Sequence, residues 1–415
     1  MRYSCGIDFG TSNSVVAIVR EGDRRAEVVI EEPSCLLVVD DGGRQAQYVG
    51  REAIARYRGS AEKTRFVKSM KSILSDPGFQ QTRIHGRSYG PAQLARPLLV
   101  HLKETAERRI GQPVDRIVLG RPVHFSERHE NDAMAEGRLL EAAALAGFTD
   151  VRLQLEPIAA GWSYASSIDR ESLVLVADIG GGTADFSVLR FRPDGSHEVL
   201  STGGVRAGGD DFDSRIMWNR LVPFFGYGSR FESWGKLLDV PVHVFVSLCR
   251  WDRIPFLKES KTWTSLQYIR SGSTDKPAIG RLMTLIEKDL GFAVFRAIAE
   301  AKHMLSGEME AMISLPENTL RIAERLTRGD FEGMIEDDVE RMVRSALDTL
   351  SDAGVDGMDV DACFLTGGCS LVPSVLRRFT SLVQPGRLST RGDTFTSVAS
   401  GLALYGMDSG ITTEK

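Results

Sequence analysis

The sequence predicts an α/β fold built from two related lobes. Strand-like apolar segments alternate with helix-like segments along most of the chain, which favours mixed sheets covered by helices. A second observation is an internal repeat, because the pattern of residues 6–16 occurs again at 177–188. Each copy has a strand, an Asp, an apolar residue, a glycine, a hydroxyl residue and a second strand. We therefore expect an N-terminal lobe over 1–172, a C-terminal lobe over 173–406 and a tail over 407–415.

Composition narrows the class of protein. The 415 residues include 51 basic and 56 acidic side chains, and the net charge of −5 argues against binding to nucleic acid. No apolar run is long enough to span a membrane, and the N-terminus shows no leader pattern, so we expect a cytoplasmic protein with no membrane contact. The five cysteines are an odd number without a C-x-x-C pair, which fits a reducing compartment and no structural zinc.

The N-terminal lobe is expected to begin with a β meander over about 1–50, because its apolar runs are separated by turn signals. The next segment, 52–74, has a helical and basic pattern, and a solvated helical surface is favoured over a lid near a bound anion. The elements expected after it are a helix over 91–109, a strand over 116–120, a helix over 127–145 with Ser126 as N-cap and Gly147 as stop, a strand over 151–155 and a helix from Pro157.

The C-terminal lobe repeats this plan around an aromatic-rich insert. Residues 221–290 are predicted to form a helical subdomain whose aromatic side chains make its own core. The other elements expected are strands over 173–176, 186–191 and 198–203, a helix from the turn 208–213, a helix over 293–305, a hairpin around 316–318, one or two helices over 330–353, a strand over 361–366, a helix from Pro373 and a small-residue helix over 395–405.

The central candidate site is the glycine turn Gly180–Gly182. Consecutive glycines let backbone N–H groups converge on an anion. Asp178 and Asp185 flank the turn, and two carboxylates suit a hydrated metal better than a bare phosphate. The pattern predicts a phosphate-binding hairpin for a metal–nucleotide complex. Asp8 and Gly10 occupy the corresponding places in the first copy, so the two hairpins are expected to hold one ligand.

Two further places fit such a ligand. Glu156 falls at a strand-to-helix junction, where ligands of α/β folds bind, although a carboxylate there is also favoured by the helix dipole. Gly208, Gly209 and Asp210 open a helix whose N-terminus can accept hydroxyl or phosphate groups, and the carboxylates favour the hydroxyls of a ribose.

These motifs together resemble the ATPase domain of DnaK-type heat-shock chaperones, within the actin-like ATPase superfamily, and are most similar to its stand-alone YegD-type branch. The stretches that carry the resemblance are 6–14, 122–125 with 156–160, 178–185, 208–213, 300–306, 326–331 and 365–373. The resemblance covers nearly the whole chain and is weakest over 221–290. It implies an actin-like ATPase fold, with two related α/β lobes around a central nucleotide cleft.

The resemblance also implies roles for single residues, with ATP or ADP and Mg²⁺ as cofactors. Asp185 or Glu156 would orient the attacking water, and the hydroxyls of Thr183 and Thr11 would reach the γ-phosphate. Asp8 and Asp178 would hold Mg²⁺ through water. The nucleotide-binding residues implied are Gly10, Thr11, Ser12, Asn13, Gly180, Gly181, Gly182, Thr183, Gly208, Gly209, Asp210, Lys302, His303, Ser306, Gly367, Gly368 and Cys369.

Departures from the family pattern lead us to expect slow turnover and altered adenine contacts. The usual active-site lysine follows a Val-Gly pair like 49–50, but Ile54 stands near that position and no lysine appears before Lys63. His303 replaces an adenine-stacking arginine. The other replacements are Ala299 for a glutamate, Cys369 for a serine and Leu371 for an arginine. The peptide-binding domain and its lid are expected to be absent.

The favoured function is a nucleotide-regulated, chaperone-like protein that hydrolyses ATP slowly and has an unknown protein client or co-chaperone. Three alternatives stay open: a nucleotide-sensing scaffold with little catalysis, a small-molecule kinase of the same superfamily, and a filament-forming protein.

Overall fold

The computed structural model describes residues 2–57, 64–126, 128–165, 170–192, 196–251, 253–315, 320–389 and 396–412. The chain divides into two compact units. Unit 1 comprises residues 1–56, 67–209 and 338–415, and unit 2 comprises 57–66 and 210–337. Among the described residues, no helix combines the length and the apolar character that a membrane span requires.

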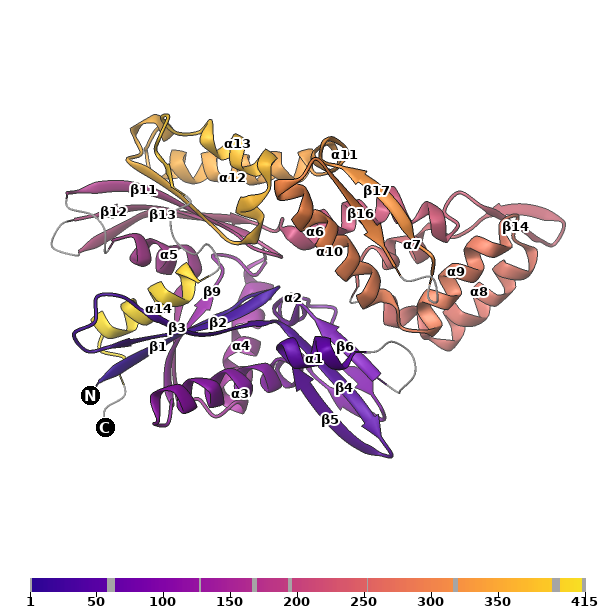
Figure 1. The fold of residues 1–415 in the computed structure, drawn as a ribbon, viewed down its shortest axis with the longest axis horizontal. Helices are drawn as coiled ribbons and strands as arrows, with labels where there is room; N and C mark the ends of the chain where they lie inside the picture. Colours follow the sequence, from indigo (N-terminus) through magenta and orange to yellow (C-terminus); the bar gives the residue numbers. More distant parts are fainter. Residues whose placement is uncertain are drawn as a thin grey trace. The chain divides into compact units, whose positions relative to one another are not determined.

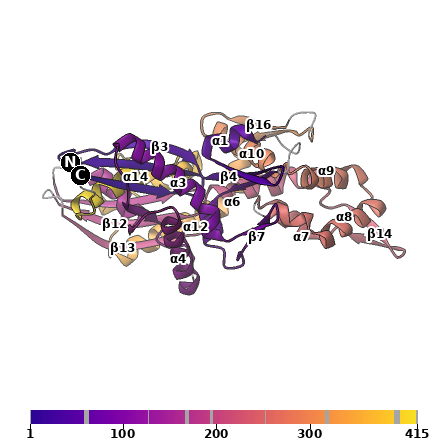
Figure 2. The same cartoon turned by 90° about the horizontal axis from the view of Figure 1, so that it is seen from below.

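The first half of unit 1 is built on a mixed sheet, as predicted, and this sheet has five strands. Its strand order is β10-β9-β1-β2-β3, with β1 antiparallel to β2 and parallel to β9. The strands are β1 (Tyr3–Phe9), β2 (Asn13–Arg20), β3 (Glu27–Pro33), β9 (Arg116–Arg121) and β10 (Asp150–Leu155). Helices α3 (Pro91–Ile110) and α4 (His129–Leu145) pack against each other, and α3 also contacts β2 and β3 (Figures 1 and 2).

A smaller sheet follows, with the order β5-β4-β6. Its strands are β4 (Cys35–Asp41), β5 (Arg44–Val49) and β6 (Thr64–Lys68), and the elements around it are α1 (Gly50–Arg56), α2 (Met70–Leu74), β7 (Thr82–Ile84) and β8 (Arg87–Tyr89). The prediction of one basic helix over 52–74 is therefore wrong. Phe66 and Val67 favour a strand and are buried in β6. Residues 58–63 of that predicted helix lie outside the described residues.

The start of α4 also differs from the prediction. The helix begins at His129 with Arg128 at the N-cap position, and Ser126 does not cap it. The Ser126 hydroxyl instead accepts a hydrogen bond from the Arg128 N–H at 3.3 Å. Asp132, in the first turn, accepts one from the Phe125 N–H at 2.6 Å and so fixes the chain that enters the helix. The prediction that the helix ends at Gly147 is confirmed, since Gly147 has a φ of +90° just after the helix.

The second half of unit 1 repeats the mixed five-stranded sheet, in the order β13-β12-β11-β18-β19. Its strands are β11 (Ser172–Ile179), β12 (Ala184–Phe191), β13 (His197–Val205), β18 (Ala362–Thr366) and β19 (Leu388–Ser389). Helices α12 (Glu336–Asp352) and α13 (Pro373–Thr380) lie on one face of this sheet and α5 (Glu156–Ala165) lies on the other (Figure 1). The predicted lobe boundary at 172 coincides with the first residue of β11 and stays a prediction.

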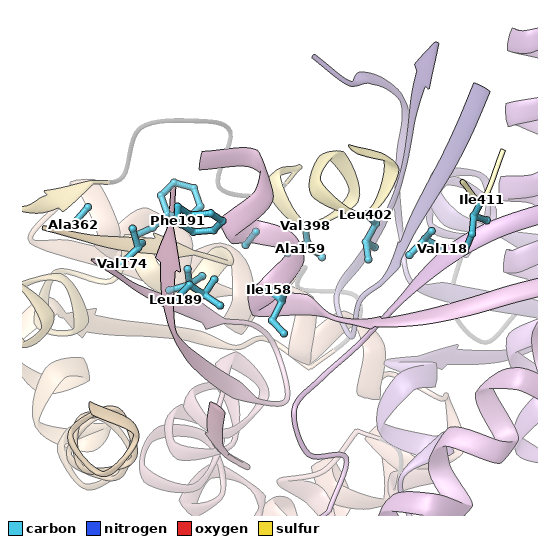
Figure 3. Packing of buried hydrophobic residues seen from close by; sticks show 13 residues of the cluster. Val118, Ile158, Ala159, Val174, Leu189, Phe191, Ala362, Val398, Leu402 and Ile411 are labelled. Carbon is cyan, nitrogen blue, oxygen red and sulfur yellow. The ribbon is translucent and has the colours of Figure 1, made fainter. Parts of the chain in front are cut away.

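One hydrophobic core joins the two sheets of unit 1. It runs from Val174 and Phe191 of the second sheet, through α5 and α14 (Ser397–Asp408), to Val118 in β9 of the first (Figure 3). The two helices approach closely, because a Cβ added at Gly401 of α14 would lie 1.6 Å from the Ala159 carbonyl oxygen of α5. The small residues predicted over 395–405 thus allow contact with a helix as well as with β1. Phe395 itself lies outside the described residues.

Unit 2 holds the aromatic-rich insert. Its elements are α6 (Gly209–Ile216), a π-helical turn (Met217–Leu221), a 3-10 turn (Pro223–Phe225), β14 (Arg230–Ser233), β15 (Lys236–Asp239), α7 (Val242–Leu248), a 3-10 turn (Ile254–Lys258), α8 (Ser260–Gly272), α9 (Lys276–Glu287), α10 (Gly291–Gly307), β16 (Glu310–Ser314), β17 (Ala323–Thr327) and α11 (Arg328–Met334). The insert is mainly helical, as predicted, but the β14–β15 hairpin next to α8 was not expected (Figure 2).

The aromatic residues of the insert fall into two groups. Phe225, Phe231 and Phe245 are buried and form part of a local core, as predicted, whereas Trp234 at the hairpin turn is 95% exposed. The predicted second hairpin is present as the antiparallel pair β16–β17, and its tip at 316–318 lies outside the described residues.

Candidate functional site

The first glycine turn connects β1 to β2. Asp8 lies near the end of β1, opposite Val15. A Cβ added at Gly10 would lie 2.1 Å from the Asn13 carbonyl oxygen, so the turn closes only with glycine at this position. The Ser34 hydroxyl donates to the Gly10 carbonyl at 2.7 Å and holds the turn against the sheet.

The second glycine turn connects β11 to β12 in the same way. The Gly180 N–H donates to the Thr183 carbonyl at 2.9 Å, and Asp178 lies directly opposite Asp185 across the hairpin. The two hairpins are not identical, because the position of Asp185 in the second is taken by Val15 in the first. The pair of facing carboxylates therefore belongs to the second hairpin.

The two turns lie against each other within unit 1. A Cβ added at Gly181 would lie 2.6 Å from the Ser12 hydroxyl oxygen and 3.2 Å from the Thr11 Cβ. One added at Gly182 would lie 3.2 Å from the Thr11 hydroxyl oxygen. The glycines of the second turn thus make room for the side chains of the first.

Four carboxylates gather behind the turns. Glu156, Asp178 and Asp185 are buried, and the Val123 N–H donates to Asp185 at 2.6 Å. Burial and then the charge of Glu156 raise the pKa values of Asp8 and Asp185 to about 7 each. The same two causes raise the pKa of Asp178 well above its usual range. The cluster carries more negative charge than its surroundings neutralise, so it favours a cation.

Lys71 of α2 supplies one cation, and it is the site residue that the sequence prediction missed. Its ammonium lies 2.5 Å from a Glu156 carboxylate oxygen, and both side chains are over nine-tenths buried. Burial alone would lower the pKa of Lys71, but the charges of Glu156 and Asp8 outweigh it, so the pKa is raised. Lys71 is therefore an ammonium ion held between the carboxylates.

The expectation that no lysine reaches the site is wrong. It was based on spacing from 49–50, which points to Ile54 in α1, whereas the chain first forms β6 and only then enters the site through α2. Lys63, the first lysine after that pair, lies outside the described residues. A signal was available in the sequence, since Lys71 stands beside the apolar residues Met70, Ile73 and Leu74. A lysine at such a position needs a buried partner.

A small pocket opens in front of Lys71. Its lining residues all belong to unit 1 and are Thr11, Lys71, Ser72, Ser75, Pro122, Phe125, Gly182, Thr183 and Arg206. Residues of both glycine turns therefore line one pocket. The lining offers hydroxyl groups and cationic side chains, whereas the carboxylates lie behind Lys71.

The remaining predicted residues of unit 1 support the second turn. The Gly209 N–H and the Cys369 thiol both donate to the Gly180 carbonyl, at 3.1 and 3.2 Å. A Cβ added at Gly208 would lie 2.5 Å from the Gly181 carbonyl oxygen. Residues 367–369 enter a 3-10 turn at Gly368, after Gly367 with a φ of +80°. These two glycine segments pack directly on the hairpin that carries Asp178.

The other predicted nucleotide-binding residues lie in unit 2. Asp210 is in the first turn of α6, and Lys302, His303 and Ser306 are in α10. The Lys302 ammonium lies 2.6 Å from a carboxylate oxygen of the buried Asp213, which joins the two helices. Contacts of these residues with a nucleoside stay a prediction.

The chain matches the protein-family model described as Hsp70 protein over residues 47–225 and 292–410. The unmatched segment between these ranges contains the β14–β15 hairpin and helices α7 to α9. This segment, 226–291, nearly coincides with the insert 221–290, in which the resemblance is weakest. The fold is the mixed α/β fold of actin-like ATPases. Because the match covers more than half of the chain, the protein belongs to the Hsp70 family of ATP-binding, chaperone-like ATPases.

Proposed function

We propose that unit 1 binds the Mg²⁺ complex of ATP at the pocket between the two glycine turns and hydrolyses it, and that the bound nucleotide regulates a chaperone-like interaction. The observation that carries this proposal is the buried Lys71–Glu156 pair behind a pocket lined by Thr11 and Thr183. A fixed cation, hydroxyl donors and carboxylates at one place are the groups that phosphoryl transfer to water requires.

The glycine turns bind the phosphates in this proposal. Thr11 of the first turn and Gly182 and Thr183 of the second line one pocket, and successive backbone N–H groups in turns of this kind favour anions. The Thr11 hydroxyl adds a donor for a terminal phosphate, and the Thr183 hydroxyl would turn from Asp185 to the phosphate when the nucleotide binds. The segments that support Gly180 keep the second turn in place.

The residues present fit a hydrated Mg²⁺ ion. Burial and then the charge of Glu156 raise the pKa values of Asp8 and Asp178, and the charge of Asp8 adds to the rise at Asp178. A divalent cation would relieve this repulsion. No group of three or more protein ligands for a metal occurs among the described residues, and this suits Mg²⁺, which keeps several waters and takes one or two carboxylates. When bound, the ion would neutralise charge on the phosphates.

Asp185 and Glu156 are the candidates to orient the attacking water. Asp185 accepts hydrogen bonds from the Val123 N–H and the Thr183 hydroxyl, and its pKa of about 7 suits proton exchange near neutral pH. Glu156 holds Lys71 in place. Because Lys71 is present, the missing lysine no longer gives a reason to expect slow turnover.

The test is calorimetry with Mg·ATP and Mg·ADP, followed by a phosphate-release assay on the same sample. We expect binding of both nucleotides and release of phosphate from ATP. Binding without phosphate release would support the nucleotide-sensing scaffold, and release that requires a small polyol would support the kinase. Binding of neither nucleotide would refute the proposal.

A further inference from the structure

The pocket in front of Lys71 has a lining suited to an anion. Four of its lining residues carry hydroxyls, namely Thr11, Thr183, Ser72 and Ser75, and the lining contains no carboxylate. Two lining residues are cationic, Lys71 and Arg206. Hydroxyl groups and cations in a lining without a carboxylate are the groups that bind a phosphate.

Lys71 and Arg206 differ in whether carboxylates of the protein neutralise their charges. Lys71 is buried and paired with Glu156, and the charges of Asp8 and Asp185 also act on it. Arg206 is exposed, and no carboxylate of the described residues forms an ion pair with its guanidinium. The charge of Arg206 is therefore available to a ligand, whereas that of Lys71 is largely balanced by the protein.

The backbone at Arg206 is held in position. Arg206 directly follows β13, and its carbonyl accepts a hydrogen bond at 3.0 Å from the guanidinium of Arg341 in α12. Arg341 lies 3.5 Å from the buried carboxylate of Asp338. Gly208, two residues further on, packs on the second glycine turn. The anchored main chain keeps the Arg206 side chain at the pocket while its guanidinium stays exposed.

We propose that Arg206 binds the terminal phosphate of the nucleotide and lets the site distinguish a triphosphate from a diphosphate. Arginine suits this role because it stays charged at all physiological pH values and can donate two parallel hydrogen bonds to phosphate oxygens. The proposal rests on the proposed function, since it assigns a binding group to the same pocket. It adds a residue outside both glycine turns that binds the γ-phosphate or, after hydrolysis, the free phosphate.

The experiment compares Arg206→Ala and Arg206→Lys with the full-length wild-type chain. Calorimetry measures the affinity for Mg·ATP, for Mg·ADP, and for inorganic phosphate added to protein saturated with Mg·ADP. Arg206→Ala is expected to weaken binding of Mg·ATP and of phosphate by about tenfold or more, while the affinity for Mg·ADP changes by less than about threefold. Arg206→Lys is expected to recover part of the loss. Arg24→Ala, at an exposed arginine in the turn between β2 and β3, serves as the control and is expected to match the wild type.

Arg341→Ala is a second variant, which removes the hydrogen bond to the Arg206 carbonyl and leaves the Arg206 guanidinium intact. It is expected to weaken Mg·ATP binding less than Arg206→Ala does. Equal losses of Mg·ATP and Mg·ADP affinity in Arg206→Ala, or no loss of either, would overturn the role of Arg206. If the wild type binds neither nucleotide, the proposed function itself fails, and this is known before any variant is compared.

Discussion

The ammonium of Lys71 lies 2.5 Å from the carboxylate of Glu156, and both side chains are buried. The contact ties α2 to the first turn of α5, two elements separated by 85 positions in the chain. A buried pair of this kind contributes little net stability when intact, but removing one partner leaves an uncompensated charge. The pair therefore couples the fold of unit 1 to the chemistry of the candidate site.

Replacing this lysine by an apolar side chain of similar length, Lys71→Met, is expected to lower phosphate release by about 100-fold or more, because the positive charge beside the reacting phosphate is lost. Without nucleotide, the variant is also expected to unfold with a free energy lower by about 3 kcal/mol, since Glu156 stays buried without its partner. Phosphate-release kinetics and urea unfolding measure the two effects.

Two comparisons make the Lys71→Met result specific. Lys261→Met, at an exposed position in α8, should leave both quantities unchanged. The double variant Lys71→Met with Glu156→Gln should regain part of the lost stability, because the carboxylate that lost its partner is then replaced by a neutral amide. Full turnover in Lys71→Met would show that Lys71 has no part in hydrolysis.

The second hairpin offers a test of the predicted roles of Asp178 and Thr183. Asp178→Asn removes a charge assigned to hydrated Mg²⁺, and Thr183→Val removes a hydroxyl assigned to the γ-phosphate at nearly constant volume. Each change is expected to lower turnover by about 100-fold or more while the protein stays folded. Phosphate release and circular dichroism check both outcomes.

The matched controls for the second hairpin are Asp23→Asn and Thr264→Val, both at exposed positions. They should behave as the wild type does. If Asp178→Asn and Thr183→Val also hydrolyse ATP at the wild-type rate, the assignment of the site to this hairpin is refuted.

Much of this arrangement could be predicted from local sequence. The two glycine turns, with Asp8 and Asp178 before them, follow from a repeated short pattern, because strand, carboxylate and glycine are encoded side by side. The mixed sheets and most helices of unit 1 follow from hydrophobic periodicity. Features carried by neighbouring residues are therefore the ones that the sequence predicts best.

Lys71 could not be placed in the same way. Its position depends on how β6 pairs and where α2 then enters the site, which is a tertiary property. The same holds for Arg206, whose place at the pocket depends on the end of β13 and on Arg341, 135 positions away. The β14–β15 hairpin was missed because an exposed Trp234 resembles a core residue when only its type is known.

The close crossing of α5 and α14 predicts that one added methyl group at Gly401 will strongly lower the stability of the protein. In Gly401→Ala the new Cβ would lie 1.6 Å from the Ala159 carbonyl oxygen, and backbone cannot move aside as a side-chain end can. The free energy of unfolding is expected to fall by about 3 kcal/mol or more.

Gly137→Ala in α4 is the matched control, because nothing lies within 4 Å of its added Cβ. It should be stabilising by about 0.5–1 kcal/mol. Urea unfolding measures both, and equal effects would contradict the tight crossing.

The contact between the two glycine turns predicts that a defect in one can be relieved by a change in the other. Gly181→Ala places a Cβ 2.6 Å from the Ser12 hydroxyl oxygen, so the Ser12 side chain must shift within the contact between the turns, and turnover is expected to fall by about tenfold. Adding Ser12→Ala removes the clashing oxygen and should restore part of the activity.

Gly208→Ala is the control. Its new Cβ would lie 2.5 Å from the Gly181 carbonyl oxygen, which is a backbone atom, so Ser12→Ala should not rescue this variant. Phosphate release from the four variants checks the pattern, and rescue of both glycine variants, or of neither, would show that the turns do not act on each other through Ser12.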